Sequence, residues 1–444
     1  FYRWFADGEM NIAYCCLDWQ IEQGRGNQIA LIYDSPVTGT QQKFSYSELK
    51  KLVANFAAGL KSKGIGKGDT VVIYMPMIPQ AAIAMLACAR IGAIHSVVFG
   101  GFAPHELAMR IDDAQPKAII SASYGVEFDK QIPYKVLVDK AIEEAKHKPS
   151  CKIFFQRSQN FDTLNHTNEF DFNDLLLNEE AACTPVLSTD TLYILYTSGT
   201  TGTPKGIVRD HGGYSTALKF SMQHFYGANP GEVFWAASDV GWVVGHSYII
   251  YGPLLHGCTT VMYEGKPVKT PDAGAFWRMI EEHKVNTLFT APTAIRAIKK
   301  EDHEGTRLRQ YDISSLKTLF LAGERCDPPT YHWANDLLHC PVIDHWWQTE
   351  SGWPMLGIMM GVEKLEPKPG AAGLPVCGYD VCILNEEGEE QPAGKEGYVT
   401  IKLPMPPGCL PTLWKDDVRF VAGYLSHFHG YYLTGDGGYK DEDG

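Results

Sequence analysis

The sequence predicts an α/β fold with two doubly wound, mostly parallel sheets and a small β subdomain at the end. Short apolar runs of strand length alternate with helical periodicity between residues 71 and 122, and again between 233 and 345. From about Gly370 the pattern changes to paired apolar runs around Gly- and Pro-containing turns. The chain has 444 residues, 45% of them hydrophobic, which exceeds the length at which one core usually stops growing. We therefore expect two or more lobes, with residues 1–369 forming two α/β subdomains and residues 370–444 the small β subdomain.

The first half follows an aromatic and acidic lead-in over residues 1–34. Ser45 and Glu48 have the spacing of a capping box, and apolar residues at helical spacing run from there to Gly64, which predicts a helix. Apolar runs then predict strands at 71–75, 94–99 and 118–122, separated by helices at 80–90 and 105–114. Residues 139–183 are less apolar, and we expect a helix, a short strand and an irregular charged segment there.

The second half contains six further predicted strands. The last part of the chain predicts an antiparallel hairpin, because two apolar runs flank a stretch rich in Glu and Gly. The expected strands lie at 192–196, 233–237, 259–263, 287–291, 318–322 and 342–345, the expected helix at 273–282, and the hairpin strands at 381–384 and 398–402.

Composition excludes some classes of partner. The formal charge is −13, from 39 Lys+Arg and 52 Asp+Glu, with no long basic run, which argues against nucleic acid or an anionic membrane. The 11 Cys are scattered without metal-ligand spacing, which favours reduced thiols in a cytosolic or organelle-matrix protein. No apolar run approaches the ~20 residues that span a bilayer. No signal peptide is visible, but the chain begins at Phe1, so a lost targeting segment stays open.

The loop at residues 197–206 has the composition of a phosphate-binding loop. It follows an apolar strand and combines glycines, hydroxyls and one Lys, which together suit the dense acceptors of a polyphosphate. It departs from a Walker A loop at Pro204 and Gly206, so a P-loop kinase or ATPase is not expected. A flexible linker is the weaker alternative. The candidate ligands are Thr197, Ser198, Gly199, Thr200, Thr201, Gly202 and Lys205.

Two further candidate stretches end predicted strands. Gly323, Glu324 and Arg325 close the strand at 318–322, which suits a ligand contact, although an ordinary turn is the favoured interpretation of these residues taken alone. Residues 344–350 are harder to explain as core, because two Trp are followed by hydrogen-bonding and metal-ligating groups. The residues in question are Asp344, His345, Trp346, Trp347, Gln348, Thr349 and Glu350.

Residues 432–436 and 239–246 are weaker signals. Asp436 follows a Thr-Gly pair, which favours a simple turn, although such an Asp could also bind both hydroxyls of a ribose. Trp242, Val243 and Val244 lie between glycines and could line a small apolar pocket or pack a helix start. His246 is more often a structural histidine than a catalyst in such a position.

Together these stretches resemble the adenylate-forming enzymes, and most closely the short-chain acyl-coenzyme A synthetases, over essentially the whole chain. The combination is specific: the loop at 196–206, Ala-Pro-Thr-Ala-Ile-Arg at 291–296, Gly-Glu-Arg at 323–325, Trp-Trp-Gln-Thr-Glu at 346–350 and Thr-Gly-Asp at 434–436. Within that group, the Val pair at 243–244, Ala-Gly-Glu-Arg at 322–325 and Ser-Gly-Trp-Pro at 351–354 resemble propionyl-coenzyme A synthetases.

The resemblance implies a reaction in two halves. A carboxylate attacks the α-phosphate of ATP to give an acyl-adenylate and pyrophosphate, and the thiol of coenzyme A then displaces AMP. The loop would hold the β- and γ-phosphates, with Lys205 supplying charge and Thr200 and Glu350 binding Mg²⁺. Thr349 would touch the α-phosphate, and Lys205, Thr349 and Glu350 form the expected catalytic set. The resemblance places adenine among Gly323, Glu324, Arg325, Asp344, His345 and Trp346, and the ribose on Asp436. Gln348 is a further expected contact of the nucleotide.

The resemblance also implies an acyl pocket made by Trp242, Val243, Val244, Ala322 and Trp347. Acetate-specific relatives carry Thr and Val where this chain has Val244 and Ala322, so this pocket is larger and more apolar, which favours propionate. For coenzyme A, Glu127 and Lys130 replace two Arg of the acetate enzymes, which leaves Gly100, Gly101 and Lys130 as the expected contacts. Family members continue into a mobile C-terminal domain, which we expect to be absent from this chain.

Other functions remain open at this point. An acetyl-coenzyme A synthetase is one alternative, and a sensor that binds nucleotide and acid without turnover is another, because binding needs the same groups. The expected partners are small molecules only, with no nucleic acid and no membrane. A bacterial cytoplasm and a mitochondrial matrix both fit as the compartment.

Overall fold

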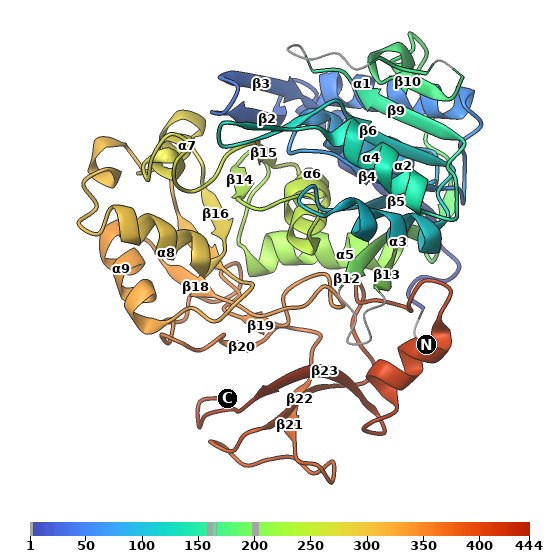
Figure 1. Cartoon of the computed structure of the whole chain (residues 1–444). Helices are drawn as coiled ribbons and strands as arrows, with labels where there is room; N and C mark the ends of the chain where they lie inside the picture. Colours follow the sequence, from blue (N-terminus) through green and yellow to red (C-terminus); the bar gives the residue numbers. More distant parts are fainter. Residues whose placement is uncertain (1–2, 158–162, 166, 198–203) are drawn as a thin grey trace.

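The computed structural model describes residues 3–157, 163–165, 167–197 and 204–444 (Figure 1). It contains two seven-stranded sheets, and a smaller three-stranded sheet lies below them in the view of Figure 1. Each seven-stranded sheet is parallel except for one antiparallel strand at its edge. The predicted α/β class with two mostly parallel sheets is therefore confirmed.

The first sheet carries the start of the candidate phosphate loop at one edge. Its last two strands pair antiparallel, with Thr197 opposite Lys205. The strands lie in the order β10 (Glu169–Asp171), β9 (Cys151–Phe155), β6 (Ala118–Ala122), β4 (Thr70–Tyr74), β5 (Ile94–Val97), β12 (Thr191–Thr197) and β13 (Lys205–Asp210).

The second sheet contains two strands from the beginning of the chain. The lead-in expected at residues 1–34 includes most of β2 (Ile29–Ser35), which pairs parallel with β15 (Thr259–Tyr263), so the description of that segment as a mere lead-in was wrong. A short apolar run becomes a sheet strand here because a partner more than 200 residues away completes its hydrogen bonds. The order is β18 (Val342–Asp344), β17 (Thr318–Leu321), β16 (Thr287–Thr290), β14 (Val233–Ala236), β15 (Thr259–Tyr263), β2 and β3 (Thr40–Ser45).

Three layers of helices cover the faces of the two sheets. α1 (Tyr46–Ser62), α2 (Pro79–Arg90) and α6 (Gly252–His256) contribute to the apolar cluster shared by both sheets. α3 (Pro104–Ala114) and α4 (Tyr134–Glu144) pack on the other face of the first sheet. α7 (Ala275–His283), α8 (Pro292–Glu301) and α9 (Pro328–Leu338) cover the other face of the second. The capping box is confirmed, since Ser45 and Glu48 exchange both hydrogen bonds at the start of α1.

The remaining helical segments are short or irregular. They are η1 (Tyr14–Asp18), η2 (Ile21–Arg25), η3 (Asn173–Leu175), α5 (Gly212–Phe220), η4 (Ser221–Phe225), η5 (Gly245–Tyr251), η6 (Leu308–Gln310), α10 (Asp417–Phe420) and η7 (Val421–Leu425). No helix among the described residues has both the length and the apolar character required to cross a bilayer.

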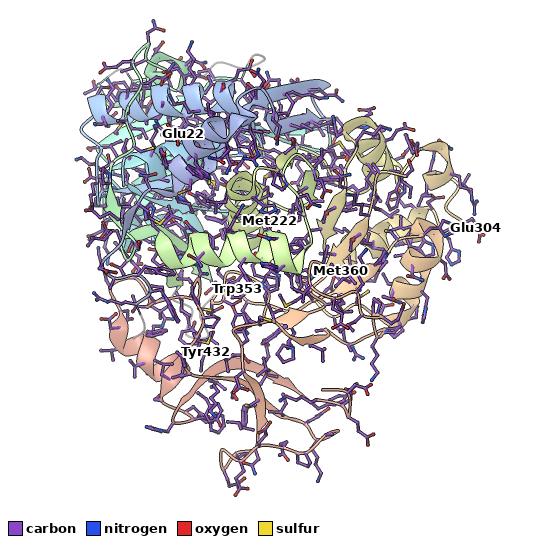
Figure 2. The ribbon with its side chains drawn as sticks, turned by 180° about the vertical axis from the view of Figure 1, so that it is seen from behind. Glu22, Met222, Glu304, Trp353, Met360 and Tyr432 are labelled. Carbon is purple, nitrogen blue, oxygen red and sulfur yellow. The ribbon has the colours of Figure 1, made fainter. Side chains whose placement is uncertain are left out.

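The three-stranded antiparallel sheet contains β21 (Val381–Leu384), β22 (Gly397–Lys402) and β23 (Tyr431–Gly438), which confirms the predicted hairpin. Met222, Trp353 and Tyr432, labelled in Figure 2, belong to one buried cluster that reaches from the helices above into this sheet. Three small two-stranded sheets complete the fold, made by β1 (Glu9–Met10) with β11 (Val186–Leu187), β7 (Gly125–Glu127) with β8 (Lys130–Ile132), and β19 (Leu356–Gly357) with β20 (Leu374–Pro375).

Candidate active site

The candidate phosphate loop connects two antiparallel strands, β12 and β13. A Walker A loop leads from a strand into a helix and uses the helix N-terminus to bind phosphate. The connection here is different, in agreement with the mismatches at Pro204 and Gly206. Thr197 ends β12 and Lys205 begins β13. The candidates Ser198, Gly199, Thr200, Thr201 and Gly202 lie outside the described residues.

Lys205 and Glu350 both contact one tyrosine, Tyr424 of η7. The Tyr424 hydroxyl donates a hydrogen bond of 2.8 Å to Oε1 of Glu350, and Nζ of Lys205 lies 3.5 Å from the same hydroxyl oxygen. The ammonium also lies 4.9 Å from the centre of the Tyr424 ring. Burial, and then the charge of Glu350, raise the pKa of Tyr424, so the hydroxyl stays protonated and remains a donor. Two of the three expected catalytic residues therefore meet at one aromatic side chain.

A buried arginine holds the backbone of the third. Arg209 of β13 is 0% exposed, and its Nη1 donates to the carbonyl oxygens of Glu350 at 2.9 Å and of Gly408 at 3.0 Å. Its Nη2 donates to the carbonyl of Thr349, and its Nε to the Tyr193 hydroxyl at 3.2 Å. Arg209 thus fixes the Thr349–Glu350 backbone to the strand that follows the loop.

Gln348 and Asp436 also come together. Nε2 of Gln348 donates to Oδ2 of Asp436 at 2.6 Å and to the carbonyl of Thr434 at 2.9 Å, while the Tyr432 hydroxyl donates to Oε1 of Gln348 at 3.4 Å. The simple turn favoured for residues 432–436 was wrong, because this stretch belongs to β23, where the pairing with β22 shifts register. Gly435 has φ +82° in this irregularity, a value that a residue with a side chain rarely adopts.

The strand-end candidates Gly323, Glu324 and Arg325 follow β17. Gly323 has φ +102° and open space around it. Glu324 makes an ion pair with Arg296 at 2.6 Å, and Arg325 donates from Nε to the carbonyl of Gly370 at 3.1 Å. The Glu324 carboxylate and the Arg325 guanidinium are thus both held by protein partners just after the strand ends.

Asp344 and His345 at the end of β18 face different surroundings. Oδ2 of Asp344 accepts a hydrogen bond of 3.0 Å from the amide of Cys326, and burial raises the pKa of Asp344 to about 6. His345 is 2% exposed, its ring lies 4.9 Å from that of Phe289, and burial lowers its pKa to about 3. His345 is therefore a neutral member of an aromatic cluster. The next residue, Trp346, exchanges backbone hydrogen bonds with Leu356.

Four of the five acyl-pocket candidates lie in or against the large buried cluster to which Met222, Trp353 and Tyr432 belong. Ala322 is 4% exposed within it, and Val243, Val244 and Trp347 pack against it. The Trp347 ring meets the Tyr248 ring edge-on at 5.5 Å.

His246, in the next turn after the two valines, fits the structural role expected of it. The residue is 0% exposed, and its Nδ1 lies 3.0 Å from the Trp242 carbonyl. Burial lowers its pKa to about 4.

Trp242 also contacts the loop that holds Gly100 and Gly101. Its ring is 45% exposed and stacks on Phe99 at 4.9 Å. A Cβ atom on Gly100 would lie 2.0 Å from the Tyr134 hydroxyl oxygen, and one on Gly101 would lie 2.4 Å from the Phe99 ring. Acyl and coenzyme A candidates are thus neighbours through Phe99.

Lys130, the remaining coenzyme A candidate, lies on the exposed strand β8. In the antiparallel pairing of β7 and β8, the backbone of Lys130 lies opposite that of Glu127. The carboxylate of Glu127 lies 3.4 Å from Nζ of Lys266. Lys266, which follows strand β15 of the second sheet, thus forms an ion pair with Glu127, the acidic residue that stands where an Arg was expected.

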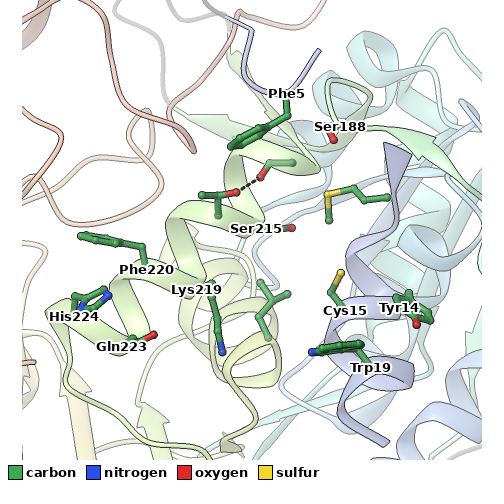
Figure 3. A pocket seen from close by; sticks show the side chains of 14 residues that line it. Phe5, Tyr14, Cys15, Trp19, Ser188, Ser215, Lys219, Phe220, Gln223 and His224 are labelled. Carbon is green, nitrogen blue, oxygen red and sulfur yellow. Dashed lines mark hydrogen bonds between the residues drawn. The ribbon is translucent and has the colours of Figure 1, made fainter. Parts of the chain in front are cut away.

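A separate hollow of about 730 Å³ lies between the beginning of the chain and α5 (Figure 3). The apolar side chains of Phe5, Met10, Trp19 and Leu255 line it, and Lys219 lies across from Trp19 (Figure 3). None of the candidate nucleotide, acyl or coenzyme A residues that the structure describes is among those that line it.

Sequence reasoning missed Arg209 and Tyr424, and it gave Tyr432 no role of its own although the candidate stretch 432–436 begins there. Arg209 lies three residues after the loop, directly behind the apolar pair Ile207 and Val208, and a charged residue beside such a pair in a strand is a usable signal. Tyr424 lies more than 200 residues from Lys205. No local pattern marks it, because its role depends on contacts between three distant segments.

Several known proteins are similar to this chain over its whole length. The family model described as "AMP-binding enzyme" matches residues 17–406. The chain is 58% identical to an uncharacterized protein of Pseudomonas aeruginosa over 100% of this chain and 71% of that protein. It is 52% identical to the human mitochondrial acyl-CoA synthetase short-chain family member 3, over 100% of this chain and 65% of that protein. It is 46% identical to the propionate–CoA ligase of Escherichia coli, over 100% of this chain and 71% of that protein. The chain thus spans about two thirds of the length of these relatives. It belongs to the AMP-binding enzyme family, in which its relatives include short-chain acyl-CoA synthetases.

Proposed function

We propose that this chain carries the nucleotide and acid sites of an ATP-dependent ligase that joins a short-chain carboxylate, preferably propionate, to coenzyme A. The acid forms an acyl-adenylate with release of pyrophosphate, and the thiol of coenzyme A then displaces AMP. The observation that supports this most strongly is the meeting of Lys205 and Glu350 at Tyr424, beside the Gln348–Asp436 pair. The residues proposed for phosphate, metal and ribose are connected to one another through the stacked rings of Tyr424 and Tyr432, which supports the proposal.

In this proposal the chain works mainly by positioning and charge. Lys205 neutralises the β- and γ-phosphates together with the loop residues, and Thr349 contacts the α-phosphate. Asp436 accepts hydrogen bonds from the ribose hydroxyls. The strand ends at 323–325 and 344–346 enclose the adenine, with Gln348 beside them.

The carboxylate of Glu350 suits Mg²⁺, a hard cation that binds through one or two carboxylates together with substrate phosphates. Thr200 of the loop is the second proposed ligand. When bound, Mg²⁺ neutralises charge that develops on the phosphates. Glu350 fits this role because the Tyr424 hydroxyl holds one of its oxygens, which orients the carboxylate.

The choice of acid depends on Trp242, Val243, Val244, Ala322 and Trp347. Ala322 replaces a Val expected in acetate enzymes, and one buried methylene contributes about 0.8 kcal/mol, or roughly fourfold in relative rate. The propionate–CoA ligase of Escherichia coli among the relatives supports this preference. An acetyl-coenzyme A synthetase is the alternative, because the difference depends on two small side chains.

For coenzyme A we propose a path beside Gly100 and Gly101, with Lys130 near its entrance. We also propose a division into two α/β subdomains over residues 1–369 and a small β subdomain over 370–444. Mitochondrial and bacterial proteins both occur among the relatives, so a mitochondrial matrix or a bacterial cytoplasm is the proposed compartment.

The test uses the full-length protein with acetate, propionate and butyrate. Pyrophosphate exchange measures the first half of the reaction, and thioester formation measures both halves. We expect the highest kcat/KM with propionate, several-fold above acetate. A clear preference for acetate would overturn the propionate assignment, and no exchange with any short acid would favour the non-catalytic sensor.

Two reciprocal substitutions test the acyl pocket. Ala322→Val fills the space at the strand end and should shift the propionate-to-acetate ratio towards acetate by about fourfold. Val244→Thr keeps the volume but adds a hydroxyl, so it should lower the preference for the longer acid without narrowing the pocket. An unchanged ratio in Ala322→Val would mean that Ala322 does not touch the acid.

A further inference from the structure

Tyr424 stands between two opposite charges of the candidate site. Its hydroxyl donates to the carboxylate of Glu350 at 2.8 Å and is also approached by the ammonium of Lys205 at 3.5 Å. The ring face lies 4.9 Å from the same ammonium. An ammonium and a carboxylate that share one hydroxyl are close enough to form a direct ion pair if that hydroxyl is removed.

The ring of Tyr424 is held firmly in place. The residue is 5% exposed, and its ring stacks on that of Tyr432 with centres 5.4 Å apart and planes 6° from parallel. The same segment is tied to the end of the phosphate loop, because Nη1 of Arg419 donates to the carbonyl of Pro204 at 3.2 Å. The amide of Trp414 donates to the carbonyl of Gly206 at 2.7 Å. The stacking and these hydrogen bonds therefore hold the Tyr424 ring in one position beside the end of the loop.

Its stacking partner continues the connection to the ribose candidate. The Tyr432 hydroxyl donates to Gln348, and Gln348 donates to Asp436 at 2.6 Å. The two stacked tyrosines thus connect the residues proposed for phosphate and metal with the residue proposed for ribose. Of the two stacked tyrosines, Tyr424 is the one that contacts both charges at the phosphate end.

We propose that Tyr424 is a positioning residue for the triphosphate and its metal ion, which keeps Lys205 and Glu350 apart and oriented before the nucleotide binds. This inference rests on the proposed function, since it assigns phosphate to Lys205 and metal to Glu350. The ring holds the Lys205 ammonium by a contact weak enough for phosphate to replace it. The hydroxyl orients Glu350 with a charge-assisted hydrogen bond. Without the hydroxyl, Lys205 and Glu350 neutralise each other, and the triphosphate must break their ion pair to bind.

The test compares MgATP with AMP, which lacks the β- and γ-phosphates. Tyr424→Phe in the full-length protein keeps the ring and the stacking but removes the hydroxyl. Isothermal titration should show MgATP binding weakened on the order of tenfold, the effect of losing one hydrogen bond to a charged group. The affinity for AMP should change less than about twofold, because AMP does not reach Lys205 or Glu350.

The matched control is Tyr379→Phe. Tyr379 is also buried in the last part of the chain, and its hydroxyl makes a hydrogen bond of 3.3 Å with Sγ of Cys409. This substitution should leave the affinities for MgATP and AMP as they are in the wild type. Thermal unfolding of both variants measures the general cost of removing a buried hydroxyl.

A second variant isolates the ion pair. In Glu350→Gln the carboxamide has no charge for Lys205 to pair with, so adding Tyr424→Phe should weaken MgATP binding by clearly less than tenfold. An equal loss of MgATP and AMP affinity in Tyr424→Phe would mean a merely structural role and would overturn the inference, as would unchanged MgATP binding. If the wild-type protein binds neither nucleotide, the proposed function itself fails, an outcome that is distinct from both.

Discussion

Replacement of Arg209 by Met should destabilise the protein and loosen the Thr349–Glu350 backbone. The Arg209 side chain is 0% exposed and donates hydrogen bonds to three carbonyl groups, those of Thr349, Glu350 and Gly408. Met has a comparable apolar length but donates no hydrogen bond. The substitution therefore removes the donors while it largely keeps the packing.

The size of the effect follows from counting the carbonyls that lose a donor. The Glu350 carbonyl also accepts a hydrogen bond of 2.8 Å from the amide of Leu410, so it keeps one partner. The carbonyls of Thr349 and Gly408 remain in the count, and each buried acceptor left without a donor costs about 1–3 kcal/mol. The variant no longer has to bury a guanidinium, which offsets part of that cost. We expect a net loss of about 2–4 kcal/mol.

Thermal unfolding without nucleotide measures this loss as a drop in Tm of several degrees. Arg309→Met is the matched control, because Arg309 is exposed and its replacement should stay within about 0.5 kcal/mol of wild type. Binding of AMP and of MgATP should both weaken in Arg209→Met, since the backbone of Thr349 is displaced. If the Tm of Arg209→Met equals that of Arg309→Met, the carbonyl contacts do not stabilise the fold and the reasoning is refuted.

Two further predictions concern pH and coenzyme A. Burial lowers the pKa of His345 to about 3, so between pH 7 and 5 the unfolded chain takes up a proton there and the folded chain does not, which costs about 2 kcal/mol of stability at pH 5. His345→Phe should therefore lose less stability than wild type between pH 7 and 5, as measured by thermal unfolding. Asp344, whose pKa is raised to about 6, acts in the opposite direction, but it does so in both proteins. An identical pH dependence of the two proteins would contradict the low pKa of His345. Gly100→Ala places a Cβ atom 2.0 Å from the Tyr134 hydroxyl oxygen, so it should raise the KM for coenzyme A and cost about 1–3 kcal/mol of stability while pyrophosphate exchange persists. Gly66→Ala, which meets no atom within 4 Å, is its control, and an unchanged KM for coenzyme A in Gly100→Ala would separate this loop from the coenzyme A path.

Local patterns were sufficient to predict most strands and the candidate motifs. The run at 118–122 became β6 with the same bounds, and the run at 259–263 became β15. Sheet membership could not be predicted in the same way, because it depends on pairing between distant segments. β2 joins the second sheet only through its contact with β15, in which Leu31 lies opposite Thr260. The same reason explains why Tyr424 was missed, since nothing in its own sequence neighbourhood indicates Lys205 or Glu350.

The distribution of positive charge around the candidate site explains how an acidic chain could bind a polyanion. The chain has a formal charge of −13, so its overall field opposes a triphosphate. The hydrogen bonds that the described structure gives the Arg209 side chain end on neutral oxygens, three carbonyls and the Tyr193 hydroxyl. A buried guanidinium bonded in this way keeps its positive field, which acts more strongly at short range in an interior than in water. Arg209 supplies that field beside Thr349 and Glu350, and in our proposal Lys205 is the cation that moves from the Tyr424 ring to the phosphates. The net charge of the whole chain therefore does not exclude a small polyanion as its ligand, and in our proposal the few cations beside the loop bind it.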